Sequence, residues 1–133
     1  MLNRLTIKEA QEGLKKKKFT SVELTQACLS RIKERNRDTN AFITVCEESA
    51  LEEAKVADGL ISAGEGSPLT GIPFSVKDAI CTAGVRSTAS AKILDNYIPP
   101  FDATVIGKIR NQGGVLLGKN NCDAFGHGAS NEN

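Results

Sequence analysis

The chain has 133 residues, of which 40% are apolar and 25% charged, which is ordinary for a globular protein and excludes intrinsic disorder. Its formal net charge is +1 at pH 7. No stretch approaches the roughly 18 apolar residues that a membrane span needs, and the first residues hold no apolar signal-peptide core, so we expect a cytoplasmic protein without membrane contact. Aromatic residues make up only 5%, which disfavours a stacking surface for single-stranded nucleic acid.

Charge is unevenly distributed along the chain. Residues 1–37 hold ten basic and four acidic residues, a net charge of +6, whereas residues 38–66 hold one basic and seven acidic residues, a net charge of −6. The lysines at 15–18 have two interpretations: a nucleic-acid contact, or the end of a helix, whose negative pole favours cations. We favour the helix end, because the neighbouring acidic block weakens the local field, and expect no contact with DNA.

The four cysteines and the single histidine, His127, predict no metal site. The sequence has no Cys-x-x-Cys pair, and Cys122, five residues before His127, does not complete a metal-ligand set. Reduced cysteines are the default expectation without a signal peptide. No glycine-rich phosphate-binding motif occurs, so we expect neither a metal nor a cofactor bound by this chain.

The first half of the chain predicts three helices and one short strand. Helices over 6–17 and 20–36 each open on a threonine followed three positions later by a glutamate, the pattern of a capping box. A strand is predicted over 41–45, and a third helix over 47–63 that stops at Gly64. The second helix has apolar residues at helical spacing: Val22, Leu24, Cys28, Leu29 and Ile32.

The second half predicts a strand–helix–strand unit. Short apolar segments at 72–77 and 115–119 are typical of strands covered on both faces. Between them we predict a loop over 78–90, a short helix over 91–96 and a helix over 102–112. Two strands joined through a helix are expected to be parallel with a right-handed crossover.

Side chains of the helix over 102–112 carry two further expectations. Asp102 is predicted to cap its first turn, because an aspartate before an apolar helical pattern accepts backbone N–H groups. Val105, Ile106 and Ile109 are predicted to point inward.

These elements define an α/β fold within one domain over residues 1–133. Residues 1–66 form an N-terminal helical segment, and residues 67–133 form the start of an α/β core. The last segment, 120–133, is small and polar and contains no element that closes the unit, so we expect the domain to be incomplete. Its strands would then have open edges, which favour aggregation of the isolated chain.

Lys77 stands where catalytic residues gather in such folds, at the end of the strand over 72–77. Burial there would favour the neutral amine, which accepts a proton and activates a hydroxyl nucleophile. The pattern alone favours the alternative, in which Lys77 reaches solvent or pairs with Asp78. Ser75 shares a strand face with Lys77 because side chains alternate, and we expect it to be a packed small residue.

Several blocks of the sequence, in order, resemble the amidase signature family. The blocks are Pro68–Asp78, Cys81–Thr88, Ser90–Leu94, Pro99–Val105, Gly118–Phe125 and Ser130–Asn133. The segment Ser21–Leu24 is similar too, so the resemblance covers essentially the whole chain. The blocks look like those of the A subunits of tRNA-dependent amidotransferases. The family fold, a mixed β-sheet flanked by helices, is the architecture that this resemblance implies, with the chain as its N-terminal part.

The resemblance implies a Ser–cis-Ser–Lys mechanism with Lys77 as general base. Both serines of the family motif would lie beyond Asn133, so the isolated chain is expected to be inactive. Ser130 matches a family serine near the lysine and is expected to steady Lys77. Three positions depart from the family pattern: Ala79, where asparagine is frequent, Ala124, where glutamate is usual, and His127, where methionine is common.

In that branch of the family, the A-type chain hydrolyses glutamine and passes ammonia to a partner chain. The resemblance implies the B and C subunits of the amidotransferase as partners, and Glu-tRNA(Gln) as the substrate converted to Gln-tRNA(Gln) by the complex. ATP and Mg²⁺ would be used mainly through the B-type partner, in agreement with the missing phosphate-binding motif here. Two alternatives stay open: a stand-alone amidase acting on small amides, and a non-catalytic protein that binds partners through its helices.

Overall fold

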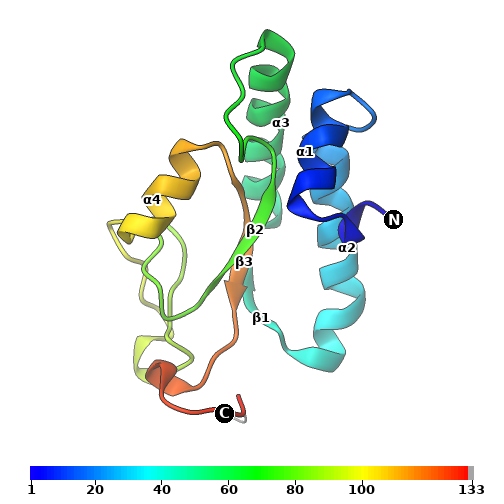
Figure 1. The fold of residues 1–133 in the computed structure, drawn as a ribbon. Coiled ribbons are helices and arrows are strands. Elements are labelled where there is room, and N and C mark those ends of the chain that lie inside the picture. Colours follow the sequence, from blue (N-terminus) through cyan, green and yellow to red (C-terminus); the bar gives the residue numbers. More distant parts are fainter. Residues whose placement is uncertain (132–133) are drawn as a thin grey trace.

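The computed structural model describes residues 1–131 as two helical layers around a small sheet (Figure 1). None of the helices in this part of the chain is both long and apolar enough to cross a bilayer. Short 3₁₀ turns lie at Leu2–Arg4 (η1), Lys92–Leu94 (η2) and Ala124–Gly126 (η3). The helices are α1 (Ile7–Lys15), α2 (Ser21–Thr39), α3 (Glu47–Ala63) and α4 (Thr104–Asn111), and the strands are β1 (Phe42–Val45), β2 (Pro73–Lys77) and β3 (Val115–Asn120).

Capping boxes start the first two helices, as the sequence predicts. The Thr6 hydroxyl accepts the N–H of Glu9 at 3.3 Å, and the Glu9 carboxylate accepts the N–H of Thr6 at 2.8 Å. Thr20 and Glu23 form the same pair at the start of α2. Because these bonds satisfy N–H groups that have no partner inside the helix, each helix begins at a defined residue. The lysine run spans the end of α1, as predicted, with φ of +53° at Lys17.

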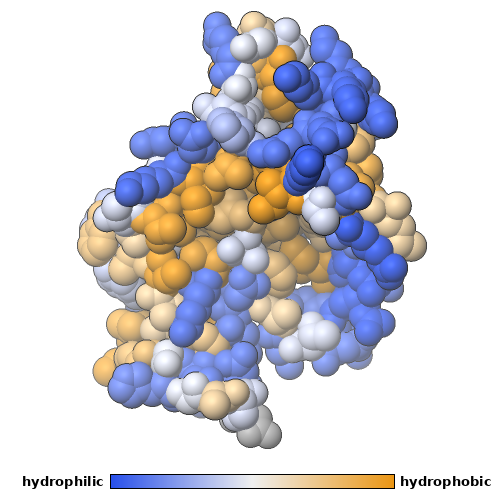
Figure 2. Space-filling view, viewed as in Figure 1, coloured by the Kyte–Doolittle hydropathy of each residue, from blue (hydrophilic) through white to orange (hydrophobic). Residues whose placement is uncertain are grey.

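The sheet is mixed, with strand order β1-β3-β2. The two strands of the second half pair in parallel, which confirms the predicted strand–helix–strand unit, and β1 pairs antiparallel with the other edge of β3. Each outer strand, β1 or β2, has one edge without a partner in the described part of the chain. Figure 2 shows an apolar area over the middle of the face in front of the sheet, bordered by hydrophilic side chains of the N-terminal helices.

Alternation along β3 divides the core between the two faces of the sheet. Val115 and Leu117 pack with Leu29 of α2 and with alanines of α3. Leu116 points to the opposite face, where it packs with Ile106 of α4 and Val76 of β2. The apolar segment therefore faces helices on both sides, which is the environment that its sequence predicts.

Three expectations about the connection between β2 and β3 are wrong. Asp102 does not cap α4, whose N-cap is Ala103 without a side-chain bond, because the Asp102 carboxylate is occupied by the N–H of Ala83 and by Arg110. Val105 is 50% exposed, because this short helix packs mainly through Ile106, about 100° away around its axis. The helix expected over 91–96 is only the single 3₁₀ turn η2.

We predict that Gly118→Ala destabilises the protein strongly. The new Cβ would lie 2.2 Å from the Thr44 carbonyl oxygen, so β1 would have to separate from β3, at a cost of about 3 kcal/mol or more. Urea denaturation of the full-length protein measures this change. Gly107→Ala is the matched control: it lies inside α4 in open space and is expected to stabilise by about 0.5–1 kcal/mol. Equal stabilities of the two variants would contradict this account.

Candidate functional site

Lys77 is the last residue of β2, and its side chain is exposed. Ser75 is exposed on the same face as Lys77. Val76 and Asp78, the residues that alternate with them along the chain, are buried, as the alternation of a strand predicts. The interpretation of Ser75 as a packed residue is wrong for residues 1–131, because this face of β2 is uncovered there. Lys77 reaches solvent and does not pair with Asp78, whose ionic partner is a different lysine.

The turn η3 lies against the amine of Lys77. A Cβ built on Gly126 would lie 3.1 Å from Lys77 Nζ, so the absence of a side chain at this position gives the amine its room. Phe125 and Gly126 both have positive φ, of +55° and +75°, and the backbone therefore turns sharply beside the lysine. Ser130 lies in the exposed segment that follows, and its predicted support of Lys77 stays a prediction.

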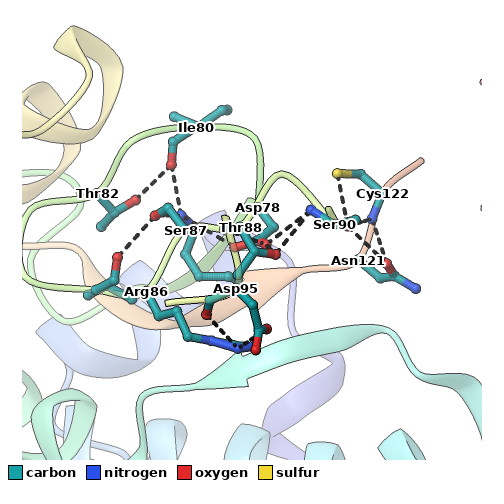
Figure 3. A network of polar contacts seen from close by, with 12 residues as sticks. Asp78, Ile80, Thr82, Arg86, Ser87, Thr88, Ser90, Asp95, Asn121 and Cys122 are labelled. Atoms are coloured by element: carbon teal, nitrogen blue, oxygen red, sulfur yellow. Dashed lines mark hydrogen bonds and ion pairs between the residues drawn. The ribbon is translucent and has the colours of Figure 1, made fainter. Parts of the chain in front are cut away.

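Asp78 anchors the loop that follows β2. One carboxylate oxygen, Oδ2, accepts the N–H of Thr88 at 2.9 Å, the hydroxyl of Thr88, and the N–H of Ser90 at 3.4 Å (Figure 3). The backbone of Asp78 also pairs with Asn120 of β3, at 2.9 Å, one step beyond the end of the strand. The end of the loop over 78–90 is therefore hydrogen-bonded to the carboxylate of its first residue, Asp78.

Lys119 is a buried charged residue beside this site that sequence reasoning did not single out. Its side chain is fully buried, and its ammonium donates to the Ile80 carbonyl at 2.7 Å and to the Ser87 hydroxyl. Its nitrogen lies 3.8 Å from Asp78 Oδ1, an ion pair that is buried on both sides. The sequence did contain a sign of it: Lys119 ends a predicted apolar strand, as Lys77 does.

Burial lowers the pKa of Lys119, because the ammonium loses its hydration. The Asp78 carboxylate opposes this shift by favouring the ammonium. The contact between Lys119 and Ser87 does not make a nucleophile of the serine. The Ser87 hydroxyl donates its proton to the Val85 carbonyl at 3.0 Å and accepts from the ammonium, so the lysine acts here as a donor and not as a base.

A second set of contacts joins the loop over 78–90 to the turn beside Lys77. Ala89 and Ser90 have left-handed backbones, with φ of +49° and +52°. The Ala89 carbonyl accepts the N–H of Phe125 at 2.8 Å. The Ser90 hydroxyl accepts the N–H of Cys122 at 3.1 Å and bonds to the Asn121 side chain (Figure 3). The loop thus shapes the segment that leads into η3.

Two hollows of the surface lie away from this site. One of about 490 Å³ is lined by Gln11 and Leu14 of α1 and by the segment around Pro68, and one of about 590 Å³ lies between η1 and α2. Lys77 lines neither. Residues 1–131 contain no group of three or more histidine, cysteine, aspartate or glutamate side chains placed to hold a metal ion. The chemistry that the described residues offer is therefore that of an exposed amine beside a glycine turn.

Comparison with known proteins identifies the family. The model of the family described as Amidase matches residues 23–133, and this chain belongs to that family. It is 48% identical over 132 residues to the A subunit of glutamyl-tRNA(Gln) amidotransferase from Dehalococcoides mccartyi, and 50% identical over 129 residues to the corresponding protein from Caldanaerobacter subterraneus. These alignments cover 99% and 97% of this chain, which spans only about a quarter of the length of each relative (27% and 26%).

Solved structures agree with the family assignment. The peptide amidase from Stenotrophomonas maltophilia superposes with a TM-score of 0.86 at 31% identity, over 92% of this chain and 26% of the amidase. The A subunit of glutamyl-tRNA(Gln) amidotransferase from Thermotoga maritima superposes with a TM-score of 0.70 at 32% identity, over 99% of this chain and 26% of that protein. The helices and the mixed sheet are therefore the amidase architecture.

The lowered pKa of Lys119 predicts how stability changes with pH. The folded protein binds this proton less tightly than the unfolded chain does, so the cost of burying the charge is relieved as the ammonium deprotonates. Relative to Lys119→Met, the wild type should gain free energy of unfolding as the pH rises from 7 through the folded-state pKa toward the ordinary lysine value of 10.5. Urea denaturation of both full-length proteins at several pH values measures the difference. A difference that stays constant or shrinks would contradict it.

Gly126→Ala is predicted to impair amide hydrolysis by the full-length protein. The added Cβ meets Lys77 Nζ at 3.1 Å, and displacement of the general base that the family resemblance implies at Lys77 is expected to lower the rate about 10- to 100-fold. Gly84→Ala is the matched control, because its φ of +72° imposes a similar backbone strain of about 1–2 kcal/mol while its Cβ meets nothing within 4 Å. Equal rates for the two variants would show that strain, and not the contact with Lys77, causes the loss.

Proposed function

We propose that this chain is part of the glutamine-hydrolysing A subunit of a glutamyl-tRNA(Gln) amidotransferase, and that it contributes the lysine base. The observation that carries the proposal is the position of Lys77: an amine at the C-terminal end of a strand, exposed, and backed by Gly126. Identities of 48–50% over nearly the whole chain to proteins of that name support the choice of substrate class.

The proposed reaction begins with the Lys77 amine acting as the base. It takes a proton from a bridging serine, which takes one from a nucleophilic serine, both supplied by a part of the protein outside residues 1–133. The nucleophile attacks the side-chain amide carbon of glutamine, the C–N bond breaks, and the returned proton leaves with ammonia. Water then hydrolyses the glutamyl ester to glutamate and restores the serine. Residues 1–133 alone are proposed to be inactive.

The rest of the proposed activity belongs to the complex. Ammonia would pass to the B-type partner, where ATP and Mg²⁺ serve the amidation of Glu-tRNA(Gln), and the small C-type partner would brace the assembly. The complex would work in the cytoplasm, where the translation machinery supplies its tRNA substrate. The proposal assigns both ATP and Mg²⁺ to the B-type partner; residues 1–131 contain no cluster of three or more metal-ligating side chains.

A second candidate function is that of an amidase that acts without partner proteins. The observation in its favour is that the peptide amidase superposes with a TM-score of 0.86, against 0.70 for the amidotransferase protein. The two functions share Lys77 and differ in substrate. Release of ammonia from glutamine, compared with release from simple aliphatic and peptide amides, separates them.

Lys77→Ala in the full-length protein is the test of the site. Loss of the base should lower ammonia release from glutamine by about 10²–10⁴-fold while the protein stays folded, since the side chain is exposed and makes no hydrogen bond within residues 1–131. An enzyme-coupled ammonia assay measures the rate, and circular dichroism monitors the fold.

Lys92→Ala provides the control for this test. Lys92 is also exposed and lies in the same connection between β2 and β3, and its removal should leave the rate within twofold of the wild type. Full activity of Lys77→Ala would refute the role of Lys77. If Lys77→Ala is inactive but the wild type prefers aliphatic or peptide amides to glutamine, the proposed role of Lys77 stands and the proposed substrate is wrong.

A further inference from the structure

Resting on the proposed function, we propose that Lys119 is a positioning residue for the base Lys77. The buried ammonium of Lys119 holds the loop over 78–90, and this loop in turn holds the turn η3 against the Lys77 amine. The two lysines lie on neighbouring parallel strands, with Lys119 opposite Val76 and Asn120 opposite Lys77. One lysine would therefore do the chemistry, and the other would fix the surroundings in which it is done.

The groups around the Lys119 ammonium all come from one loop. All three of its partners, the Ile80 carbonyl, the Ser87 hydroxyl and the Asp78 carboxylate, belong to the loop over 78–90. The lysine itself belongs to β3. A single buried charge thus connects the central strand to the beginning, the middle and the far side of an irregular loop that has no helix or strand of its own.

Hydrogen bonds connect Asp78 to the end of the loop. Asp78 Oδ2, the carboxylate oxygen that is not paired with Lys119, accepts the N–H groups of Thr88 and Ser90. The Asp78 backbone carbonyl accepts the N–H of Ala89 at 3.2 Å. These bonds hold Ala89 and Ser90 in the left-handed conformation, which is unfavourable for residues with a side chain. The conformation therefore depends on the carboxylate that Lys119 neutralises.

The end of the loop contacts the turn beside Lys77. The Ala89 carbonyl accepts from Phe125, and the next residue, Gly126, borders Lys77 Nζ. A change in the Asp78 carboxylate is thus transmitted through two backbone hydrogen bonds to the surface on which the base rests. Each contact in this path joins adjacent groups, so no long-range effect needs to be assumed.

Stability alone does not account for a charge at this position. A buried ion pair carries a large desolvation cost, and apolar residues of similar volume are often neutral or stabilising replacements. Leu116 and Leu117 of the same strand show that this sheet accepts apolar side chains on both faces. What a methionine at position 119 cannot supply is a donor for the Ile80 and Ser87 oxygens and a positive charge beside the Asp78 carboxylate.

Lys119→Met in the full-length protein tests the proposal, because it keeps the volume and removes the charge. We expect kcat for glutamine hydrolysis to fall at least tenfold with KM within twofold of the wild type. Leu29→Ala is the matched control: it removes a buried side chain that packs against the alanines of α3 and against β3 and is in a cluster without loop residues, and it should lower the melting temperature without lowering kcat by more than twofold. A kcat for Lys119→Met within twofold of the wild type, or lowered no more than that of Leu29→Ala, overturns the proposal.

Thr88→Val keeps the test decisive if Lys119→Met does not fold. It is isosteric and removes only the hydroxyl that donates to Asp78. We expect kcat to fall at least threefold at unchanged KM, and an unchanged kcat overturns the proposal. Lys77→Ala, assayed alongside, separates the two levels: if it keeps activity, the proposed function fails, whereas if it is inactive and Thr88→Val and Lys119→Met behave as the wild type, only the positioning role fails.

Discussion

The buried ion pair between Lys119 and Asp78 is the constraint on which the irregular half of this molecule depends. The connection between β2 and α4 has no regular element longer than one 3₁₀ turn, so hydrogen bonds inside a helix or sheet cannot hold it. Buried backbone and hydroxyl groups there need partners, and unpaired ones are costly. The Lys119 ammonium and the Asp78 carboxylate, which lie side by side, supply such partners. Thr88, Ser87 and Ser90 take their places around this pair.

The pleat of the sheet explains why two lysines on neighbouring strands have opposite surroundings. Residues of β2 and β3 are in parallel register, so Lys119 shares its level with Val76 and is enclosed with it. Lys77 is one step further along and points to the open face. A shift of one residue between the strands would exchange these environments. The register changes between Phe74 and Ser75, where β3 has one extra residue, Leu117, and this change brings Lys119 opposite the buried Val76.

Local patterns in the sequence predicted the regular elements well, whereas contacts between distant residues escaped them. The capping boxes at Thr6 and Thr20 act within four residues, so their effect on helix starts is visible in the sequence. Asp102 also has the form of a cap, yet it bonds to Ala83, nineteen positions earlier, and such competition cannot be read locally. Lys119 was missed for the same reason, because its hydrogen-bond partners lie 32 and 39 positions away in the sequence. The resemblance to the amidase family located Lys77 but assigned nothing to the lysine behind it.

The place of β3 in the sheet also has a consequence for how the chain acquires its structure. Among the three strands of residues 1–131, this one lies in the middle of the sheet but comes third in the sequence, and within these residues β1 and β2 both pair with it and not with each other. During synthesis, the helices form from local contacts while the two outer strands wait without partners. Once residues 115–126 have been synthesised, the sheet, the buried ion pair and the turn at Gly126 can form together. Because such non-local pairing carries the entropy of closing long loops, we expect a late, concerted and comparatively slow step in folding.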